Sequence, residues 1–245
     1  MENSAPMDRI SNLPDELLCH ILSFLPTKFA FKTSVLSKRW TPLCKLLTSL
    51  IFDDKSVYGE HALLHFCRLV NKVMLSHKLI KKLHLKCGSV HWNSLKFHHW
   101  IENAKQRPLE NLHVSSNLQL IISGQSIFIF PTLVVLKLSM IKVDDNISVD
   151  LPSLKTLYLD HVHFKNKENF GKLLSGCPVL EDLCTRIHYA EEDNGVSTGG
   201  FETLSKLIKA NIRAFDVPFK AIHKVQFLTV VVMDVELHRT AVKYC

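Results

Sequence analysis

A short apolar string, Leu-x-x-Leu-x-Leu or a close variant, recurs along this chain from residue 80 onward. Alternate side chains of a β-strand point to the same side, so the later apolar positions of each string face one core. A single unit cannot bury that face, whereas stacked units bury it together and form a curved parallel sheet. The seven units are IKKLHL from Ile80, LENLHV from Leu109, LVVLKL from Leu133, LKTLYL from Leu154, LEDLCT from Leu180, LSKLIK from Leu204 and IHKVQF from Ile222.

Successive units start 29, 24, 21, 26, 24 and 18 residues apart. Most of these intervals fall in or near the window of roughly 20–29 residues that leucine-rich repeats use. The last two units fit the pattern least well, and the asparagine position of the strict consensus is mostly occupied by other residues. We expect short helices or turns between the strands, including a helix from Asn166 to Ser175 with Phe170, Leu173 and Leu174 on its inner face.

The N-terminal fifty residues have a different pattern, which indicates three short helices. Pro14 suits a first helical turn, and Asp15 and Glu16 complement the positive end of the helix dipole. Pro26 is expected to end this helix, because proline lacks the N–H that a helix needs. The apolar positions between them, at helical spacings of three and four, are Leu17, Leu18, Ile21, Leu22 and Leu25.

A second helix is predicted from about Lys28 to Leu36, with Thr27 as its cap. Ser37 is expected to cap a third helix that contains Trp40, and Pro42 leaves open whether that helix begins before or near Thr41. Three helices in about forty residues bury too little apolar area to be stable alone. A partner, or the domain that follows, is therefore expected to cover part of this apolar surface.

The string ISNLPDELLCHILSFLPTKFAFKTSVLSKRWTPLCK, from Ile10 to Lys45, resembles an F-box. It has the Leu-Pro pair, the acidic turn, the Ile-Leu-Ser-Phe-Leu-Pro end of the first helix and the Val-Leu-Ser-Lys-Arg-Trp signature. Cys177 to Leu183 is similar to the CPxLExL string of plant F-box proteins with leucine-rich repeats. The chain therefore resembles the plant F-box/LRR or F-box/FBD/LRR family, and we expect the C-terminal FBD domain to be absent.

The resemblance implies a substrate-recognition subunit of an SCF-type cullin-RING E3 ubiquitin ligase. Such a subunit binds a Skp-type adaptor, and through it the cullin and RING subunits, while its repeats hold a target protein. Packing between the helices is an equally good interpretation for Leu18 and Val35. The adaptor contacts implied by position are Leu13, Pro14, Leu17, Ile21, Leu22, Leu25, Pro26, Val35, Leu36 and Trp40.

The target would lie on the side chains between the repeat leucines, if the family geometry holds. These side chains are mixed and mostly basic, which suits an acidic target, although an ordinary solvated face explains them equally well. The substrate-binding residues we predict are Lys82, His84, His113, Lys137 and Tyr158.

The fold class that follows is α/β: an N-terminal three-helix F-box and then an irregular leucine-rich-repeat solenoid with a curved parallel sheet. We divide the chain into a flexible N-terminus (1–7), the F-box (8–50), a helical connector (51–78) and degenerate repeats (79–245). Ala190 to Gly200 is expected to be an exposed loop, because it is rich in acidic residues and glycine.

The net charge of +7 favours nucleic-acid binding. The lysines, however, occur singly or in pairs and not in the long runs typical of nucleic-acid-binding segments. No apolar stretch approaches membrane-spanning length, and Phe227 to Met233 is predicted to be a buried strand. We therefore expect neither nucleic acid nor membrane as a partner. Seven cysteines without a CxxC pair or a signal peptide indicate a reducing compartment, the nucleus or the cytoplasm.

No catalytic signature is present in the sequence, and neither a cofactor nor a metal is expected. His161 and His163 would share one face of a strand, yet no set of carboxylates or cysteines has ligand spacing around them. Glycine-rich phosphate loops and GxSxG elbows are missing. Two alternatives to a ligase subunit stay open, namely a truncated adaptor-binding F-box protein without a productive substrate site and a basic nucleic-acid-binding repeat protein.

Overall fold

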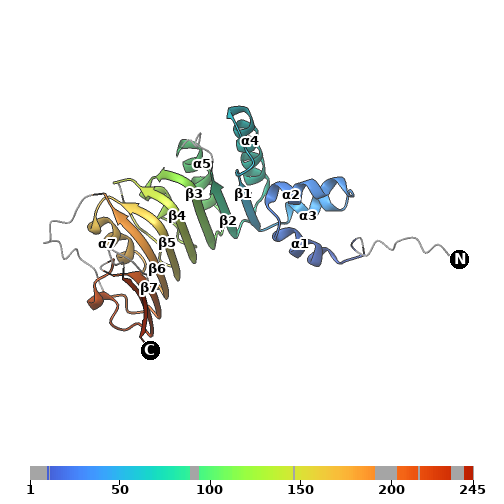
Figure 1. The fold of residues 1–245 in the computed structure, drawn as a ribbon. Coiled ribbons are helices and arrows are strands. Elements are labelled where there is room, and N and C mark those ends of the chain that lie inside the picture. Colours follow the sequence, from blue (N-terminus) through green and yellow to red (C-terminus); the bar gives the residue numbers. More distant parts are fainter. Residues whose placement is uncertain are drawn as a thin grey trace.

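The computed structural model describes residues 10, 12–88, 94–145, 147–190, 203–214, 216–232 and 240–244. Within these ranges, three helices are followed by a nine-stranded sheet whose strands lie in chain order from β1 to β9. Strands β1 to β8 pair in parallel, and β9 pairs antiparallel with β8. The sheet is curved and open, with the N-terminal helices beyond its β1 edge (Figure 1). This arrangement confirms the predicted α/β class.

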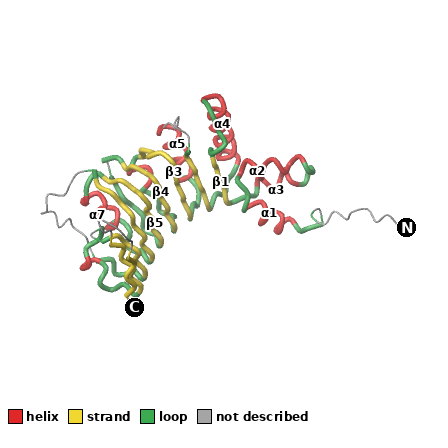
Figure 2. Tube along the Cα trace, viewed as in Figure 1, coloured by secondary structure: helices red, strands yellow, loops and turns green. Residues whose placement is uncertain are grey.

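Figure 2 shows the strands side by side in one curved sheet, with helices and loops connecting them. The helices are α1 Asp15–Ser23, α2 Thr27–Lys32, η1 Thr33–Val35, α3 Trp40–Lys45, α4 Glu60–Ser76, α5 Ser94–Lys105, α6 Gly124–Ile127, α7 Lys167–Ser175 and η2 Phe219–Ala221. The strands are β1 Ser49–Asp53, β2 Lys82–Cys87, β3 Asn111–Ile122, β4 Val135–Val143, β5 Thr156–Phe164, β6 Asp182–Tyr189, β7 Lys209–Arg213, β8 Phe227–Val232 and β9 Thr240–Tyr244.

The N-terminal helices form where the sequence predicts them, but neither predicted cap residue caps its helix. The N-cap residue of α3 is Arg39 and not Ser37, whose hydroxyl accepts a hydrogen bond of 3.2 Å from the Arg39 N–H. Helix α1 follows Pro14 and ends at Ser23, and α2 continues as the 3₁₀ turn η1. Thr27 does not cap α2: its hydroxyl accepts a hydrogen bond of 2.8 Å from the backbone N–H of Ile51 in β1. Helix α3 begins at Trp40, which places Pro42 in the first turn, where no backbone N–H is needed.

The first five predicted units have the predicted register, because each strand begins two residues after the first apolar residue of its unit. The sixth and seventh units are misaligned by three residues. Strands β7 and β8 begin at Lys209 and Phe227, so the true units are LIKANI from Leu207 and VQFLTV from Val225. The error has a physical source, because Leu204 and Ile222 are also buried and imitate the first position of a unit.

The structure adds a repeat that the sequence pattern did not reveal. The string LTSLIF from Leu47 forms β1, which pairs with β2 from Ser49 to Asp53. The helical connector expected at 51–78 contains α4, but the sheet already starts before it, so the boundary at 79 is not where the repeats begin. The next unit starts at Ile80, a longer interval than any other, because the 17-residue helix α4 lies between them.

The core lies between the sheet and the helices that follow the strands. Three apolar positions are buried in each of the units that form β2 to β5, for example Leu154, Leu157 and Leu159. Helix α7 forms as predicted, with the side chain of Asn166 capping it and the expected three apolar residues buried. The predicted strand at 227–233 is also present as β8, although Phe227 and Val232 are exposed. Apart from Ala190, the predicted loop at 190–200 lies outside the described residues, as does the predicted flexible segment 1–7.

Candidate interaction surfaces

Apolar side chains remain on the surface of the N-terminal helices. Leu17 and Ile21 of α1 are 49% and 45% exposed, and Val35 and Leu36 after α2 are 86% and 68% exposed. The spacing of four residues places Leu17 and Ile21 on one side of α1. Large apolar groups gathered on a small domain mark a surface that a partner covers.

Other predicted contact residues lie inside this domain. Leu22 is fully buried and Trp40 is 7% exposed, so both pack in the core beneath the surface. Leu13 and Leu25 are partly buried against the same core, whereas Pro14 is exposed and Pro26 is half-buried. In this conformation Leu22 and Trp40 therefore support the surface from within, and the contact role of all ten predicted residues stays a prediction.

Four exposed apolar residues of this domain were not among the predicted contacts: Ile10, Phe24, Phe29 and Leu46. Phe24 lies seven residues after Leu17, and its ring packs edge-on against His20 at 4.8 Å. The helical spacing of Leu17, Ile21 and Phe24 is the signal that identifies Phe24 as a member of this surface.

Arg39 fixes the segment that leads into α1. Its Nε donates to Oδ1 of Asp15 at 2.9 Å, and one terminal nitrogen donates to the backbone carbonyl of Leu13 at 2.6 Å. The Leu-Pro segment is therefore held against the Lys-Arg-Trp signature by a charge-assisted pair.

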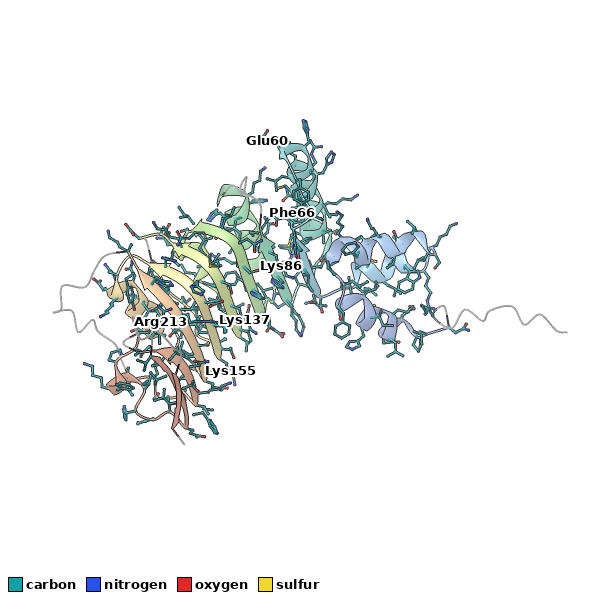
Figure 3. All side chains as sticks on the ribbon, viewed as in Figure 1. Glu60, Phe66, Lys86, Lys137, Lys155 and Arg213 are labelled. Atoms are coloured by element: carbon teal, nitrogen blue, oxygen red, sulfur yellow. The ribbon has the colours of Figure 1, made fainter. Side chains whose placement is uncertain are left out.

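A second candidate surface is the open face of the sheet, defined as the side chains of β1 to β8 that alternate with the buried positions. Backbone pairing brings His84 opposite His113, His113 opposite Lys137, and Lys137 opposite Tyr158. Four of the five predicted substrate-binding residues thus form one row across β2 to β5. Lys82, the fifth, lies on the same face two residues before His84. Lys86 and Lys137 are labelled in Figure 3 on β2 and β4.

The two histidines of the row are stacked, with ring centroids 3.8 Å apart. Burial, together with the charges of His113, Lys86 and Lys137, lowers the pKa of His84 to about 4, and the charge of Asp53 partly opposes them. Burial, Lys137 and Lys86 lower the pKa of His113 to about 4. Both rings are therefore neutral near pH 7. The Nε2 atom of His84 is buried without a hydrogen-bond partner among the described residues.

Two cations on the C-terminal half of the open face, Arg186 and Lys209, lie beside carboxylates. Nε of Arg186 lies 2.9 Å from Oδ1 of Asp160, and Nζ of Lys209 lies 4.0 Å from Oδ2 of Asp182. Directly before β5, Nζ of Lys155 lies 2.8 Å from Oε1 of Glu181, and directly before β2, Nζ of Lys81 lies 3.0 Å from Oε1 of Glu110.

Three histidines lie together on β5 and β6. Nδ1 of His161 is 3.2 Å from Nε2 of His188, and the rings of His163 and His188 stack at 4.7 Å. His161 has a positive φ of 51°, where β5 is irregular. Within the described ranges, no group of three or more His, Cys, Asp or Glu side chains has the geometry to hold a metal ion.

The cysteines of the described ranges are free thiols. Burial raises the pKa of each, so at neutral pH they are protonated and poor nucleophiles. They are Cys19, Cys44, Cys67, Cys87, Cys177 and Cys184. Among the helices that the structure describes, none has the length and apolar character needed to cross a bilayer.

Comparison with known proteins finds matches to both the N-terminal helices and the repeat sheet. The F-box domain model matches residues 10–51, and a leucine-rich-repeat model matches residues 153–178. An FBD-associated F-box protein of Arabidopsis thaliana is 41% identical over 187 residues, which are 72% of this chain and 42% of the relative. An F-box/FBD/LRR-repeat protein of the same plant is 39% identical over 186 residues, 72% of this chain and 40% of the relative. An F-box/LRR-repeat protein of the same plant is 39% identical over 197 residues, which are 75% of this chain and 50% of the relative.

The N-terminal helices are thus an F-box, and the curved sheet is a leucine-rich-repeat solenoid. The homologues of this chain are the F-box/LRR-repeat and FBD-associated F-box proteins of Arabidopsis. The chain spans half or less of the length of these curated relatives.

Proposed function

We propose that this chain is a substrate-recognition subunit of an SCF-type cullin-RING ubiquitin ligase. The F-box binds a Skp-type adaptor, the adaptor connects it to the cullin and RING subunits, and the open face of the repeats binds a target protein. The observation that carries the proposal is the combination of an F-box that exposes apolar side chains with a repeat sheet whose open face is polar. The apolar surface of the F-box suits a helical partner that stays bound, and the polar open face of the sheet suits a target that binds and is released.

The chain contributes no catalytic group in this proposal. Its role is to hold a target near the ubiquitin-transfer site, which raises the effective concentration of the target lysine. The protonated thiols and the lack of a metal-ligand set within the described ranges are consistent with a binding role. We place the protein in the nucleus or the cytoplasm, where ligases of this type act.

Adaptor binding tests the first half of the proposal. The purified chain and a recombinant Skp-type adaptor are mixed, and their affinity is measured by biolayer interferometry. The variant with Leu17→Ala and Leu36→Ala removes exposed side chains of the F-box, so it should fold normally and bind at least about tenfold more weakly.

The matched control carries Leu75→Ala and Leu79→Ala, which removes two exposed leucines outside the F-box, 71% and 44% exposed. It should bind the adaptor like the wild type. Absence of adaptor binding by the wild type, or equal weakening by both double variants, would overturn the proposal.

A further inference from the structure

Within the described residues, most cations on the open face of β2 to β4 have no carboxylate beside them, unlike Arg186 and Lys209 further along the sheet. This part of the face carries Lys82, Lys86, Lys137 and Lys142, and its strands contain no carboxylate. Lys86 lies 3.4 Å from Oδ2 of Asp53 on β1. Lys82 and Lys137 are exposed and have no carboxylate within ion-pair distance among the described residues. The paired cations of β6 and β7, Arg186 and Lys209, show the contrast within one sheet.

Two of these lysines, Lys82 and Lys137, flank the stacked histidines. Lys82 precedes His84 on β2, and Lys137 pairs in register with His113 on β3. With about 4.8 Å between strands and 3.3 Å per residue, the Cα atoms of Lys82 and Lys137 are about 12 Å apart. In an extended peptide, side chains four residues apart point the same way and are separated by about 13 Å. The two distances match.

Between the lysines the surface is flat, neutral and able to form hydrogen bonds. Both imidazoles are uncharged at neutral pH, and one nitrogen of His84 is buried without a partner among the described residues. Such a surface accepts the flat face or a polar group of a side chain placed between two acidic ones. It does not repel a ligand by charge.

We propose that the open face of β2 to β4 binds an extended acidic segment of the target protein, with acidic side chains four residues apart on Lys82 and Lys137 and the intervening residue on the His84–His113 pair. The identity of the ligand as a target segment rests on the proposed function, whereas the site itself rests on this chain alone. Carboxylate and phosphate groups share the required chemistry, and the test separates them.

The test measures binding of fluorescent ten-residue peptides to the purified full chain by anisotropy. One peptide has two glutamates four residues apart, a second has phosphoserines in their place, and a third has lysines. Binding of either acidic peptide and not of the lysine peptide is expected, and it should weaken as salt rises because exposed charges are screened. Failure of both acidic peptides to bind at about millimolar concentration would overturn the proposal.

Charge reversal locates the site. Lys82→Glu with Lys137→Glu should weaken binding at least about tenfold, an effect typical of losing two charge contacts. Lys72→Glu with Lys220→Glu changes the net charge equally, at exposed positions on α4 and η2, and should weaken it less than threefold. Equal weakening by both variants would show that only the overall charge matters and would overturn the proposed site.

The histidine pair adds a second readout. Because both rings titrate near pH 4, binding of the glutamate peptide should change less than twofold between pH 6 and 8. A rise in affinity with a midpoint near pH 6.5 would contradict the neutral stacked pair. The Lys82→Glu/Lys137→Glu variant should bind the adaptor normally, so loss of the peptide site and failure of the adaptor proposal are distinguishable.

Discussion

The F-box and the repeat sheet bury their leucines in opposite ways. In the sheet, the apolar positions of the central units are buried, and the alternating side chains outside are mostly polar or charged, with Ile121, Val135 and Met140 among the apolar exceptions on β3 and β4. In the F-box, leucine neighbours on one helix divide between the core and the surface, since Leu18 is buried and Leu17 is exposed. The comparison teaches that a repeat satisfies its apolar face by stacking on the next repeat, whereas a three-helix domain has no such neighbour and retains an apolar surface.

The two regions are nevertheless joined through one backbone ladder and one buried hydroxyl. Strand β1 follows directly after α3, and the Thr27 hydroxyl of α2 accepts the N–H of Ile51 in that strand. Near this junction an apolar cavity of about 360 Å³ is lined by Phe29 of α2, Tyr58, and Phe66 of α4. The first repeat therefore packs directly against the F-box and helps to hold its helices in place.

The largest expected effect comes from truncating one buried leucine of the sheet. Leu138→Ala in β4 should lower the free energy of unfolding by about 2–5 kcal/mol, because Leu138 is fully buried and its removal leaves a cavity. Leu36→Ala, the same chemical change at an exposed F-box position, should alter it by less than about 0.5 kcal/mol. Urea unfolding measures both, and similar losses for the two variants would break the comparison.

A smaller effect should come from Asp216, a buried carboxyl group three residues after the end of β7. Thr185 occupies a position that is apolar in the other central units, and its hydroxyl donates to Oδ2 of Asp216 at 3.0 Å. Burial raises the pKa of Asp216 to about 6, while the hydrogen bond from Thr185 and the charge of Arg213 oppose the rise. In the unfolded chain this carboxyl titrates near pH 3.9, so the folded protein binds the extra proton between about pH 4 and 6.

The contribution of Asp216 to stability is therefore full below about pH 4 and is lost as pH rises through about 6. The Asp216→Asn variant has no carboxyl group to ionise at this position. The difference between its free energy of unfolding and that of the wild type should therefore increase by up to about 3 kcal/mol between pH 4 and 7. Thermal or urea unfolding across this pH range measures the difference. A difference that stays constant with pH would show that Asp216 titrates normally in the folded protein.

The smallest effect concerns the junction. Thr27→Val preserves the shape of the side chain but leaves the Ile51 N–H without its acceptor, which should cost about 1–2 kcal/mol. Amide exchange at Ile51 should accelerate in this variant. Thr41→Val, at an exposed position of α3, is the matched control and should leave that exchange unchanged. Unchanged exchange in both variants would mean that the F-box does not stabilise the first repeat.

Periodicity within single segments was readable from the sequence. The spacing of Leu17, Ile21 and Leu22 predicted a helix, and the alternation within LKTLYL predicted a strand, because both patterns repeat over a few residues of the local backbone. Aligning five units also placed His84, His113, Lys137 and Tyr158 at equivalent positions. The sixth and seventh units failed because buried residues outside a strand, such as Leu204, have the same local signature as those inside it.

What the sequence by itself determined is the set of side chains that share a face within each helix or strand, and hence the F-box and the repeats. Only the tertiary structure decided which of those faces are covered. It buried Leu22 and Trp40 within the F-box and used the Thr27 hydroxyl to hold β1. It also placed carboxylates beside Arg186 and Lys209, while Lys82 and Lys137 have none within ion-pair distance in the described parts of the chain. The reason is physical: the direction of a side chain follows from local backbone geometry, whereas burial and charge pairing depend on segments that are distant in sequence and meet only in the fold.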